Sequence, residues 1–296
     1  MIGRSALPSA RRAAVATARV GAARVPHPGT LLSYAALWLM VIVALFPFYW
    51  MLVGSLSPLG DLFASPPAVV PRHPTLDNYV ELFARIPFAR NLLNSLIISS
   101  LSSVLGLVLA TLAGFGFSKY HFPGRDVLFY LLIATLILPD EVLVIPLFIV
   151  MSQIGWVDTY QGAALPGVAS AFGIFWMRQY MASIPSELLD AARIDGASEP
   201  QIYWRIVLPV LGPALAALAI ILFMRSWNSF LWPLVVLRSE AMYTVPLSLA
   251  RLIGIFEQPW HLVLAGSALA TAPLVVVFVL LQRHFIAGVM AGSLRA

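Results

Sequence analysis

The sequence predicts an all-α membrane protein with six transmembrane helices, and its composition and charge distribution support this fold class. Hydrophobic residues make up 60% of the 296 residues and charged residues only 10%, whereas a soluble domain usually carries about 25% charged residues. The mean hydropathy is +0.89. The charged residues leave several gaps that each hold roughly the 20 apolar residues needed to cross a bilayer. Because lipid offers the backbone no hydrogen-bond partners, we expect every span to be helical.

Four spans are predicted where charge is absent, at about 31–54, 91–117, 159–178 and 261–282. Two further apolar stretches, about 127–150 and 211–237, are interrupted by charge. Asp140 and Glu141 interrupt the first of them, and Arg225 interrupts the second. Charged groups at membrane depth are costly and usually face a cavity or a partner. These three residues are therefore candidates for a functional role.

The first 28 residues contain five arginines and no acidic residue, with many Ala, Gly and Pro. Such a composition predicts a flexible cytoplasmic tail that contacts anionic lipid. A cleaved signal peptide is the alternative. Against it, a continuous hydrophobic run begins only near Thr30 and is long enough to remain as a span. We therefore divide the chain into a basic tail, 1–28, and a transmembrane domain, 29–296.

The distribution of Lys and Arg predicts the orientation. With the N-terminus inside, the cytoplasmic parts carry twelve basic residues: Arg4, Arg11, Arg12, Arg19, Arg24, Lys119, Arg125, Arg178, Arg193, Arg205, Arg283 and Arg295. The external parts then carry five: Arg72, Arg85, Arg90, Arg238 and Arg251. The positive-inside rule therefore favours both termini in the cytoplasm. This orientation also places the segment 183–210 in the cytoplasm.

Two longer segments between spans are predicted on the external side. The first, about 55–90, starts Pro-rich and continues as TLDNYVELFARIP, which predicts a short amphipathic helix along the membrane interface. The second, 238–260, has charged residues at its ends and an apolar middle.

The polar segment 183–210 predicts an ordered helix–turn–helix rather than an irregular loop. Gly196 can adopt the positive φ that ends a helix, and Ser198 with Gln201 forms a capping-box pattern for the next helix. The small side chains of Ala191 and Ala192 do not protrude, so another protein could pack closely against them.

This segment resembles the coupling-loop signature of ABC importer permeases. In that signature Glu-Ala-Ala is followed after three residues by Gly, and after nine more by Ile-x-Leu-Pro. The matching residues here are Asp190, Ala191, Ala192, Gly196, Ile206, Leu208 and Pro209, with Asp190 at the position of the Glu. Surrounding phrases resemble the carbohydrate-uptake branch of the maltose-permease type: FASPPAVVP (63–71), FGFSKYHFPGR (115–125), GIFWMRQYMASIP (173–185), SWNSFLWPL (226–234) and LLQRHFIAGVMAGSL (280–294). The resemblance runs from about residue 31 to the C-terminus.

The resemblance implies a type I ABC importer permease fold and a defined set of partners. These are a second homologous permease, two ATPase subunits that bind ATP and Mg, and an extracytoplasmic solute-binding protein. The chain itself is expected to bind no cofactor. The residues expected to couple to an ATPase are Glu187, Asp190, Ala191, Ala192, Asp195, Gly196, Ile206, Leu208 and Pro209. The residues expected to contact the binding protein are Arg251, Gly254, Phe256, Glu257 and Gln258, for which the alternative is an ordinary packed interfacial loop.

The substrate pathway is expected to include Asp140 and Glu141, about 14 residues into the third span. Arg225, Asn228 or Ser229, and Trp232 are spaced to share one face of the fifth span. Aromatic rings, amides and guanidinium groups suit a polyol such as a sugar. For Asp140 and Glu141 the alternatives are a structural ion pair or a position nearer the outer surface. Arg225 is expected to neutralise one of them or to attract an anionic substrate group. The alternative for Trp227 and Trp232 is helix packing or interface anchoring. Asn91, Asn94 and Ser95 are expected to cap a helix or to form interhelical hydrogen bonds.

Other classes of function find little support in the sequence. Cysteine is absent, and the five histidines are scattered without a metal-ligand spacing. Lys119, the single lysine, lacks the glycines of a nucleotide-binding loop. The pI of about 9.8 reflects membrane orientation rather than nucleic-acid binding. We therefore expect a permease subunit of an ATP-driven sugar importer; the alternative is an ATP-independent secondary transporter or channel, which leaves the signature at 183–210 unexplained. The sequence does not specify the sugar.

Overall fold

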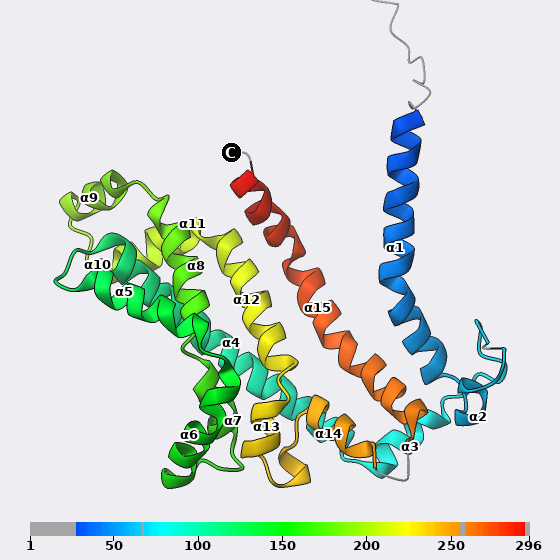
Figure 1. Ribbon diagram of the computed structural model, residues 1–296. Helices are drawn as coiled ribbons and strands as arrows, with labels where there is room; N and C mark the ends of the chain where they lie inside the picture. The colour runs from blue at the N-terminus through cyan, green and yellow to red at the C-terminus, as the bar shows by residue number, and fades with distance from the viewer. Residues whose placement is uncertain (1–27, 67, 255–257, 294–296) are drawn as a thin grey trace, which may run out of the picture. The chain divides into compact units, whose positions relative to one another are not determined.

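The computed structural model describes residues 28–66, 68–254 and 258–293, and within these ranges every regular element is a helix (Figure 1). Side chains are described for these residues except 28, 31, 281 and 283–293. The chain forms two units, 1–49 and 50–296. Most of the first unit's described part belongs to helix α1 (Pro28–Ser55), whose apolar stretch Leu32–Ser55 coincides with the first predicted span. Its large apolar side chains are exposed, as a lipid-facing surface requires.

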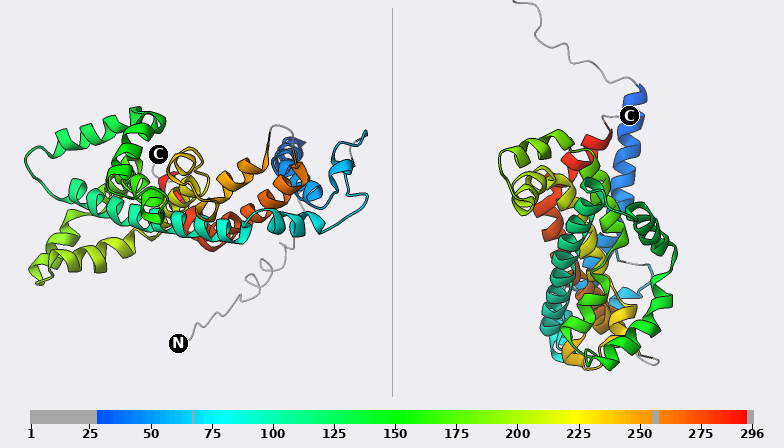
Figure 2. Two further views of the ribbon diagram at one scale, coloured as in Figure 1. Left: turned by 90° about the horizontal axis from the view of Figure 1, so that it is seen from below. Right: turned by 90° about the vertical axis from the view of Figure 1, so that its left-hand side faces the viewer.

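The long helix α4 (Phe88–Lys119) is the centre of the second unit and matches the second predicted span (Figures 1 and 2). Helices α8 (Ala171–Ala182) and α12 (Gly212–Trp227) pack along it. The α4–α8 contact is close because small residues line it. A Cβ atom at Gly114 would lie 2.8 Å from Met177 Cβ and 3.0 Å from the Arg178 amide nitrogen. Small residues that allow such an approach are typical of helix packing in membranes.

Helix α15 (Trp260–Ser293) contains the last predicted span and packs against α12, α14 (Val245–Leu252) and α3 (Asp77–Arg85). The single turn α2 (Leu59–Leu62) follows α1. Helix α3 comes next and is the short amphipathic helix expected in this segment. One of its polar residues, Asn78, is buried rather than exposed, because its Nδ2 donates to the carbonyls of Ser55 and Ser57, both at 2.9 Å. These bonds fix α3 to the end of α1.

The third predicted span is sharply bent. Helix α5 (Arg125–Ala134) continues into the 3₁₀ turn η1 (Thr135–Ile137), and α6 (Asp140–Gln153) leaves at 103°. The break falls at Pro139, whose extended backbone (ψ 135°) cannot continue the preceding helix.

The fifth predicted span, 211–237, is also divided. Helix α10 (Glu199–Ile202), the π-helical turn η3 (Tyr203–Val207) and α11 (Leu208–Val210) lead into α12 through a bend of 82°. Helix α12 ends at Trp227, and α13 (Leu231–Val236) follows after a three-residue break. The 3₁₀ turn η4 (Glu240–Met242) then leads to α14.

Among the described residues, three helices are long and apolar enough to span a membrane, or up to five if each bent pair counts as one. The predicted count of six is not reached in this way because 159–178 is not one helix. It consists of α7 (Tyr160–Ala164), the 3₁₀ turn η2 (Leu165–Gly167) and α8. Ser170 caps the start of α8 by accepting from the Gly173 amide at 3.1 Å, so a new helix begins inside the predicted span.

Candidate functional site

The 183–210 segment forms the helix–turn–helix that its sequence predicts. Helix α9 (Ser186–Ile194) ends at Asp195, and Gly196 adopts a φ of +84°. The Gly196 amide donates to the Arg193 carbonyl at 3.0 Å, as a left-handed helix end requires. Ser198 and Gln201 form the predicted capping box, in which Gln201 Oε1 accepts from the Ser198 amide at 2.8 Å. The local signals therefore define this turn correctly.

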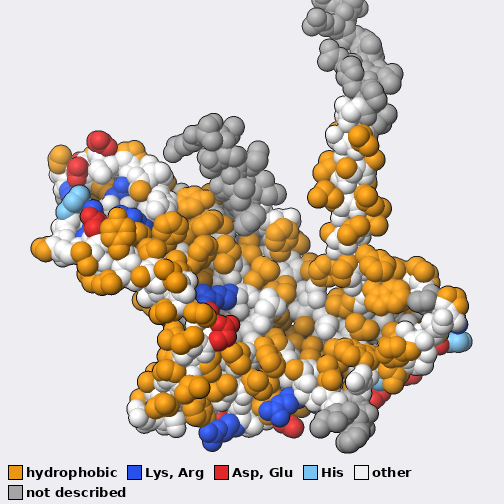
Figure 3. Space-filling view, in the orientation of Figure 1, with side chains coloured by type: hydrophobic (Ala, Val, Ile, Leu, Met, Phe, Trp, Pro, Cys, Tyr) orange, Lys and Arg blue, Asp and Glu red, His pale blue; other side chains and the backbone are white. Residues whose placement is uncertain are grey.

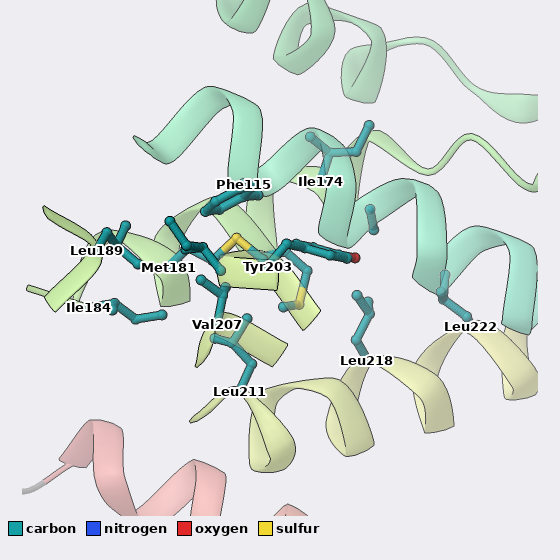
Figure 4. Packing of buried hydrophobic residues seen from close by; sticks show 13 residues of the cluster. Phe115, Ile174, Met181, Ile184, Leu189, Tyr203, Val207, Leu211, Leu218 and Leu222 are labelled. Atoms are coloured by element: carbon teal, nitrogen blue, oxygen red, sulfur yellow. The ribbon is translucent and has the colours of Figure 1, made fainter. Parts of the chain in front are cut away.

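The inner side of the 183–210 segment is part of a hydrophobic core shared with α4, α8 and α12. Leu189 and Ile202 are fully buried in this core, and Tyr203 points into it (Figure 4). The Tyr203 hydroxyl also lies 2.7 Å from Thr111 Oγ1 on α4. Three residues of the signature, Ala192, Ile206 and Leu208, are half-buried against the same core. These three contacts hold the segment on the membrane helices and leave Ala192, Ile206 and Leu208 partly exposed.

Ion pairs and hydrogen bonds join the two helices of the segment to the end of α4. Arg193 bridges Asp190 and Glu199, each at 2.7 Å. Glu199 also accepts a short hydrogen bond from the Tyr120 hydroxyl, and Lys119 Nζ donates to the Ile184 carbonyl at 2.5 Å. This network makes the 183–210 segment and α4 one mechanical unit.

The pKa values in the network follow from these contacts. Burial and the hydrogen bond to Glu199 raise the pKa of Tyr120 to about 12. Hydrogen bonds from Arg193 and from Tyr120 lower the pKa of Glu199, so this carboxylate stays ionised at neutral pH. Sequence analysis did not single out Arg193, Glu199 or Tyr120. Their pairing depends on the turn at Gly196 and on the position of α4, which composition does not reveal.

The outer side of α9 exposes apolar side chains at helical spacing. Leu188 is 45% exposed and Ile194 is 87% exposed, and Ala191 is exposed between them. Of the other predicted coupling residues, Glu187, Asp190, Asp195, Gly196 and Pro209 are exposed as well. Figure 3 shows charged side chains gathered around the α9–α10 end of the second unit. Leu188, Ala191 and Ile194 together give this polar segment an exposed apolar face; the sequence signal for it is the spacing 188, 191 and 194.

Asp140 and Arg225 meet across the two bent spans. The Arg225 guanidinium lies 2.5 Å from Asp140 Oδ2. Asp140 and Glu141 do not lie inside a straight span, as expected, but in the first turn of α6, directly after the break at Pro139. A helix N-terminus stabilises carboxylates there. The ion pair is therefore the structural alternative considered from the sequence, and it joins the α5–α6 break to the end of α12.

The predicted polar face with Arg225, Asn228, Ser229 and Trp232 does not form. Asn228 caps the end of α12, where its Nδ2 donates to the Met224 carbonyl at 2.9 Å, and the helix does not continue through Ser229. Trp232 lies on α13 instead, and its Nε1 donates to the Gly162 carbonyl of α7 at 3.1 Å. The break places these residues in different surroundings. Trp232 therefore packs between helices, which was the alternative to a substrate contact.

The residues expected to contact a binding protein follow α14 or end it. Arg251 is exposed in its last turn, with the guanidinium 5.7 Å from the centroid of the Tyr243 ring. Gly254 and Gln258 are exposed, and Gln258 Oε1 accepts from Trp260 Nε1 at 3.3 Å. Phe256 and Glu257 lie outside the described residues. Within the described part of the chain, no cluster of three or more His, Cys, Asp or Glu side chains could hold a metal ion.

Comparison with known proteins defines the class of this chain. Residues 87–290 match the family described as binding-protein-dependent transport system inner membrane component. The arabinooligosaccharides transport system permease protein AraQ of Halalkalibacterium halodurans is 38% identical over 268 residues, which cover 87% of this chain and 96% of that protein. The lactose transport system permease protein LacG of Rhizobium radiobacter is 35% identical, with 90% and 96% covered. The sn-glycerol-3-phosphate transport system permease protein UgpE of Brucella abortus is 33% identical, with 88% and 95% covered.

Solved structures show the same fold. A chain in the crystal structure of a bacterial ABC transporter for import of the acidic polysaccharide alginate superposes with a TM-score of 0.76 at 22% identity, covering 86% of this chain and 95% of that one. The match to the alginate transporter in complex with an alginate pentasaccharide-bound periplasmic protein has a TM-score of 0.59 at 20% identity. The fold is that of an ABC importer permease. The chain belongs to the family of binding-protein-dependent transport system inner membrane components, and is a multi-pass membrane subunit of a transporter.

Proposed function

We propose that this chain is the permease subunit of an ATP-driven importer for a sugar or sugar derivative, delivered by an extracytoplasmic binding protein. A second, homologous permease completes the pathway, and two ATPase subunits supply the energy by hydrolysing ATP with Mg. This chain holds neither ATP nor another cofactor. Both termini lie in the cytoplasm, in agreement with the twelve-to-five distribution of basic residues. Relatives named for arabinooligosaccharide and lactose transport support a carbohydrate substrate.

The outer face of α9 carries this proposal. A partner that binds there finds Leu188, Ala191 and Ile194 exposed, while Leu189 of the same helix is 1% exposed in the core. Burying an exposed apolar face gives affinity, at roughly 25 cal/mol per Å² of apolar surface. The buried side of α9 packs against the core shared with α4, α8 and α12, so a push on its outer face is passed on to that core. A movement of the ATPase would therefore reach α4 and α8.

Substrate passage would use the break points of the two bent spans. Helix breaks at membrane depth are tolerated where backbone lines a cavity or is buried in protein. The pair of Asp140 with Arg225 and the adjacent Glu141 provide polar groups at these breaks. Asn228 at the end of α12 lies in the same part of the chain. We assign these residues to the pathway and treat Ser229 and Trp232 as supporting positions.

The test is whether the ATPase stays with the complex when the outer face of α9 becomes charged. Ile194→Asp should remove the ATPase from the affinity-purified importer and abolish uptake, because a carboxylate replaces an apolar contact. Val80→Asp is the matched control: Val80 is 70% exposed on α3, at the other end of α4. The proposal is wrong if Ile194→Asp retains the ATPase in normal amount, or if both variants lose it equally.

A further inference from the structure

We propose that Asn94, with Ser95 and Asp158, positions the segment 236–245 on helix α4, so that docking of the binding protein is transmitted into that helix. This inference rests on the proposed function, because it takes a binding protein to dock at the residues expected to contact it, such as Arg251 and Gln258, which end or follow α14. The 236–245 segment runs from the end of α13 through η4 to the first residue of α14. Its internal backbone hydrogen bonds are those of the Met242 and Tyr243 amides to the carbonyls three residues earlier. Most of its other hydrogen bonds are made to residues of other elements.

The Asn94 carboxamide bonds to the segment at two places. Asn94 is fully buried, and its Nδ2 donates to the carbonyls of Ala241 at 2.8 Å and Tyr243 at 3.0 Å. Its Oδ1 accepts from the Tyr160 hydroxyl of α7 at 2.7 Å. Three bonds from one buried amide join three elements that are far apart in the sequence. Both donor hydrogens of the amide are used on this segment, which leaves little freedom to rotate.

Ser95, the next residue on α4, holds the start of α14. Its Oγ accepts from the Val245 amide at 2.8 Å, and both residues are buried. The first amides of a helix have no partner inside that helix. Ser95 therefore supplies, from a different helix, one of the hydrogen bonds that α14 lacks at its start.

Asp158 holds the other end of the segment. Its Oδ1 accepts from the amides of Arg238 at 2.9 Å and Ser239 at 3.1 Å, and its own amide donates to the Val236 carbonyl at 2.8 Å. Burial raises the pKa of Asp158, but these hydrogen bonds outweigh burial and lower it overall, so the carboxylate stays charged. Asp158 adopts a φ of +59°, which aims its backbone at the segment. Asn and Asp tolerate this conformation better than other non-glycine residues.

Apolar packing also holds the same segment. Val236, Tyr243 and Leu247 are buried in a cluster with Ile98 of α4. The polar and apolar contacts together fix the segment, whereas Arg251 at the far end of α14 is exposed. This arrangement suits a rigid support that ends in a contact surface.

Helix α4 links this support to the 183–210 segment. Asn94 and Lys119 lie about 25 residues apart on one continuous helix, or about 38 Å. At its far end, Lys119 and Tyr120 bond to the 183–210 segment. A displacement of 236–245 therefore moves a single rod that reaches the proposed ATPase contact. The bonds of Asn94 and Ser95 are the points where that displacement enters the rod, and Asp158, before α7, holds the segment from a second element.

The experiment uses the complete importer in lipid nanodiscs with two readouts. Hydrogen exchange of peptides within 236–247 reports whether the segment is held. The concentration of the sugar-loaded binding protein that half-maximally stimulates ATP hydrolysis reports whether the holding matters for docking. Asn94→Leu keeps the size of the side chain and removes its hydrogen bonds. It should speed exchange about tenfold and raise that concentration about tenfold, with unstimulated hydrolysis unchanged, because a lost hydrogen bond to a buried group has effects of this order.

Three variants complete the series. Ser103→Ala also removes a buried hydroxyl from α4, but this hydroxyl bonds to Ser99 within the helix, so it should behave like the wild type. Asp158→Ala should resemble Asn94→Leu, whereas Asp158→Asn should be close to wild type because it keeps the acceptor and the backbone preference. If Asn94→Leu does not assemble, Asp158→Ala gives the same comparison.

Unchanged exchange in both Asn94→Leu and Asp158→Ala overturns the proposal, and so does faster exchange with normal stimulation by the binding protein. Equal effects of Ser103→Ala overturn it as well, because the cause would then be general destabilisation of α4. A wild-type importer that its binding protein does not stimulate would contradict the proposed function instead. The exchange readout would stand in that case.

Discussion

The segments 183–210 and 236–245 lie at the two ends of α4, and different chemistry holds each of them. In the first, exposed ion pairs form most of the polar contacts: Arg193 pairs with Asp190 and Glu199 within one short stretch of chain. In the second, groups far away in the sequence form these bonds: the buried Asn94 of α4, whose partner Ala241 is 147 residues away, and the carboxylate of Asp158 before α7. Exposed ion pairs are weak and exchange readily with water, whereas buried hydrogen bonds are costly to break. The exposed polar contacts of the first segment can thus rearrange when a partner binds, while its buried core holds α9 in place, and the second segment keeps one conformation.

The largest loss of uptake is expected from a substitution that breaks the turn of the 183–210 segment. Gly196→Pro should reduce uptake more than about a hundredfold, because proline fixes φ near −65° and misfit proline costs about 3 kcal/mol or more, and Gly196 has a φ of +84°. Initial uptake rates at equal expression measure the effect. Gly155→Pro is the matched control: Gly155 also has a positive φ, of 72°, and its amide also donates to the carbonyl three residues earlier.

Gly155→Pro imposes the same local strain outside 183–210 and should retain measurable uptake with the ATPase bound. Equal loss in the two variants would mean that any strained turn stops the importer. The special role of the 183–210 segment would then be lost.

The same comparison explains how much the sequence could predict. The turn at Gly196 and the capping box of Ser198 were correct, because both depend on residues within a few positions of each other. The breaks in the third and fifth predicted spans were not placed, although Pro139 was a visible cause of the first. Proline permits a break without requiring one, and tertiary packing decides.

The buried contacts of the 236–245 segment could be predicted only in kind. Asn91, Asn94 and Ser95 were expected to cap a helix or to form interhelical hydrogen bonds, and all three bond to residues 240–245, Asn91 through its Nδ2 to the Glu240 carbonyl at 3.4 Å. Their partners could not be named, because the pairing depends on how distant helices pack. The expected face with Asn228 and Trp232 failed for a related reason: helical spacing holds only while the helix continues, and α12 ends at Trp227.

An intermediate effect is expected where the two bent spans meet. Asp140→Asn and Arg225→Gln should each reduce uptake about tenfold, since each leaves one charge of the proposed pathway unpaired at membrane depth, where the protein itself leaves the two side chains 75% and 55% exposed. The double variant should recover to within about threefold of wild type, because groups in contact are not additive. Initial uptake rates of the wild type, the two single variants and the double variant make up this double-mutant cycle. Strictly additive losses would contradict a direct role of the pair and would separate this region from both ends of α4.

The smallest effect concerns acid pH at the first segment. The bonds of Glu199 to Arg193 and Tyr120 lower its pKa below the ordinary value of 4.5, so its stabilisation is complete above that value. The stabilisation is lost as the pH falls through the lowered pKa. Since the side chain is 44% exposed, water screens much of the effect, which should be about 0–1 kcal/mol.

Hydrogen exchange of 186–202, measured between pH 7 and pH 3 and corrected for the intrinsic rate, should rise at the acid end. Glu199→Gln should show the faster exchange already at pH 7 and little further change. An equal acid response in Glu199→Gln and wild type would assign the loosening to another group. The 236–245 segment is held by the carboxylate of Asp158, whose pKa is also lowered, so the internal reference is the stretch 98–112 of α4, which contains no titratable side chain.

The central claim is that the outer face of α9 contacts an ATPase. The most direct test places a photoreactive benzoylphenylalanine at position 194 in the assembled importer, with position 80 on α3 as the control. Ile194 and Val80 are both exposed apolar residues, at 87% and 70%. On irradiation, position 194 should form a covalent product with the ATPase subunit, identified by mass spectrometry, and position 80 should form none. An ATPase product from position 80 but not from position 194 would contradict both the coupling role and the orientation proposed for this chain.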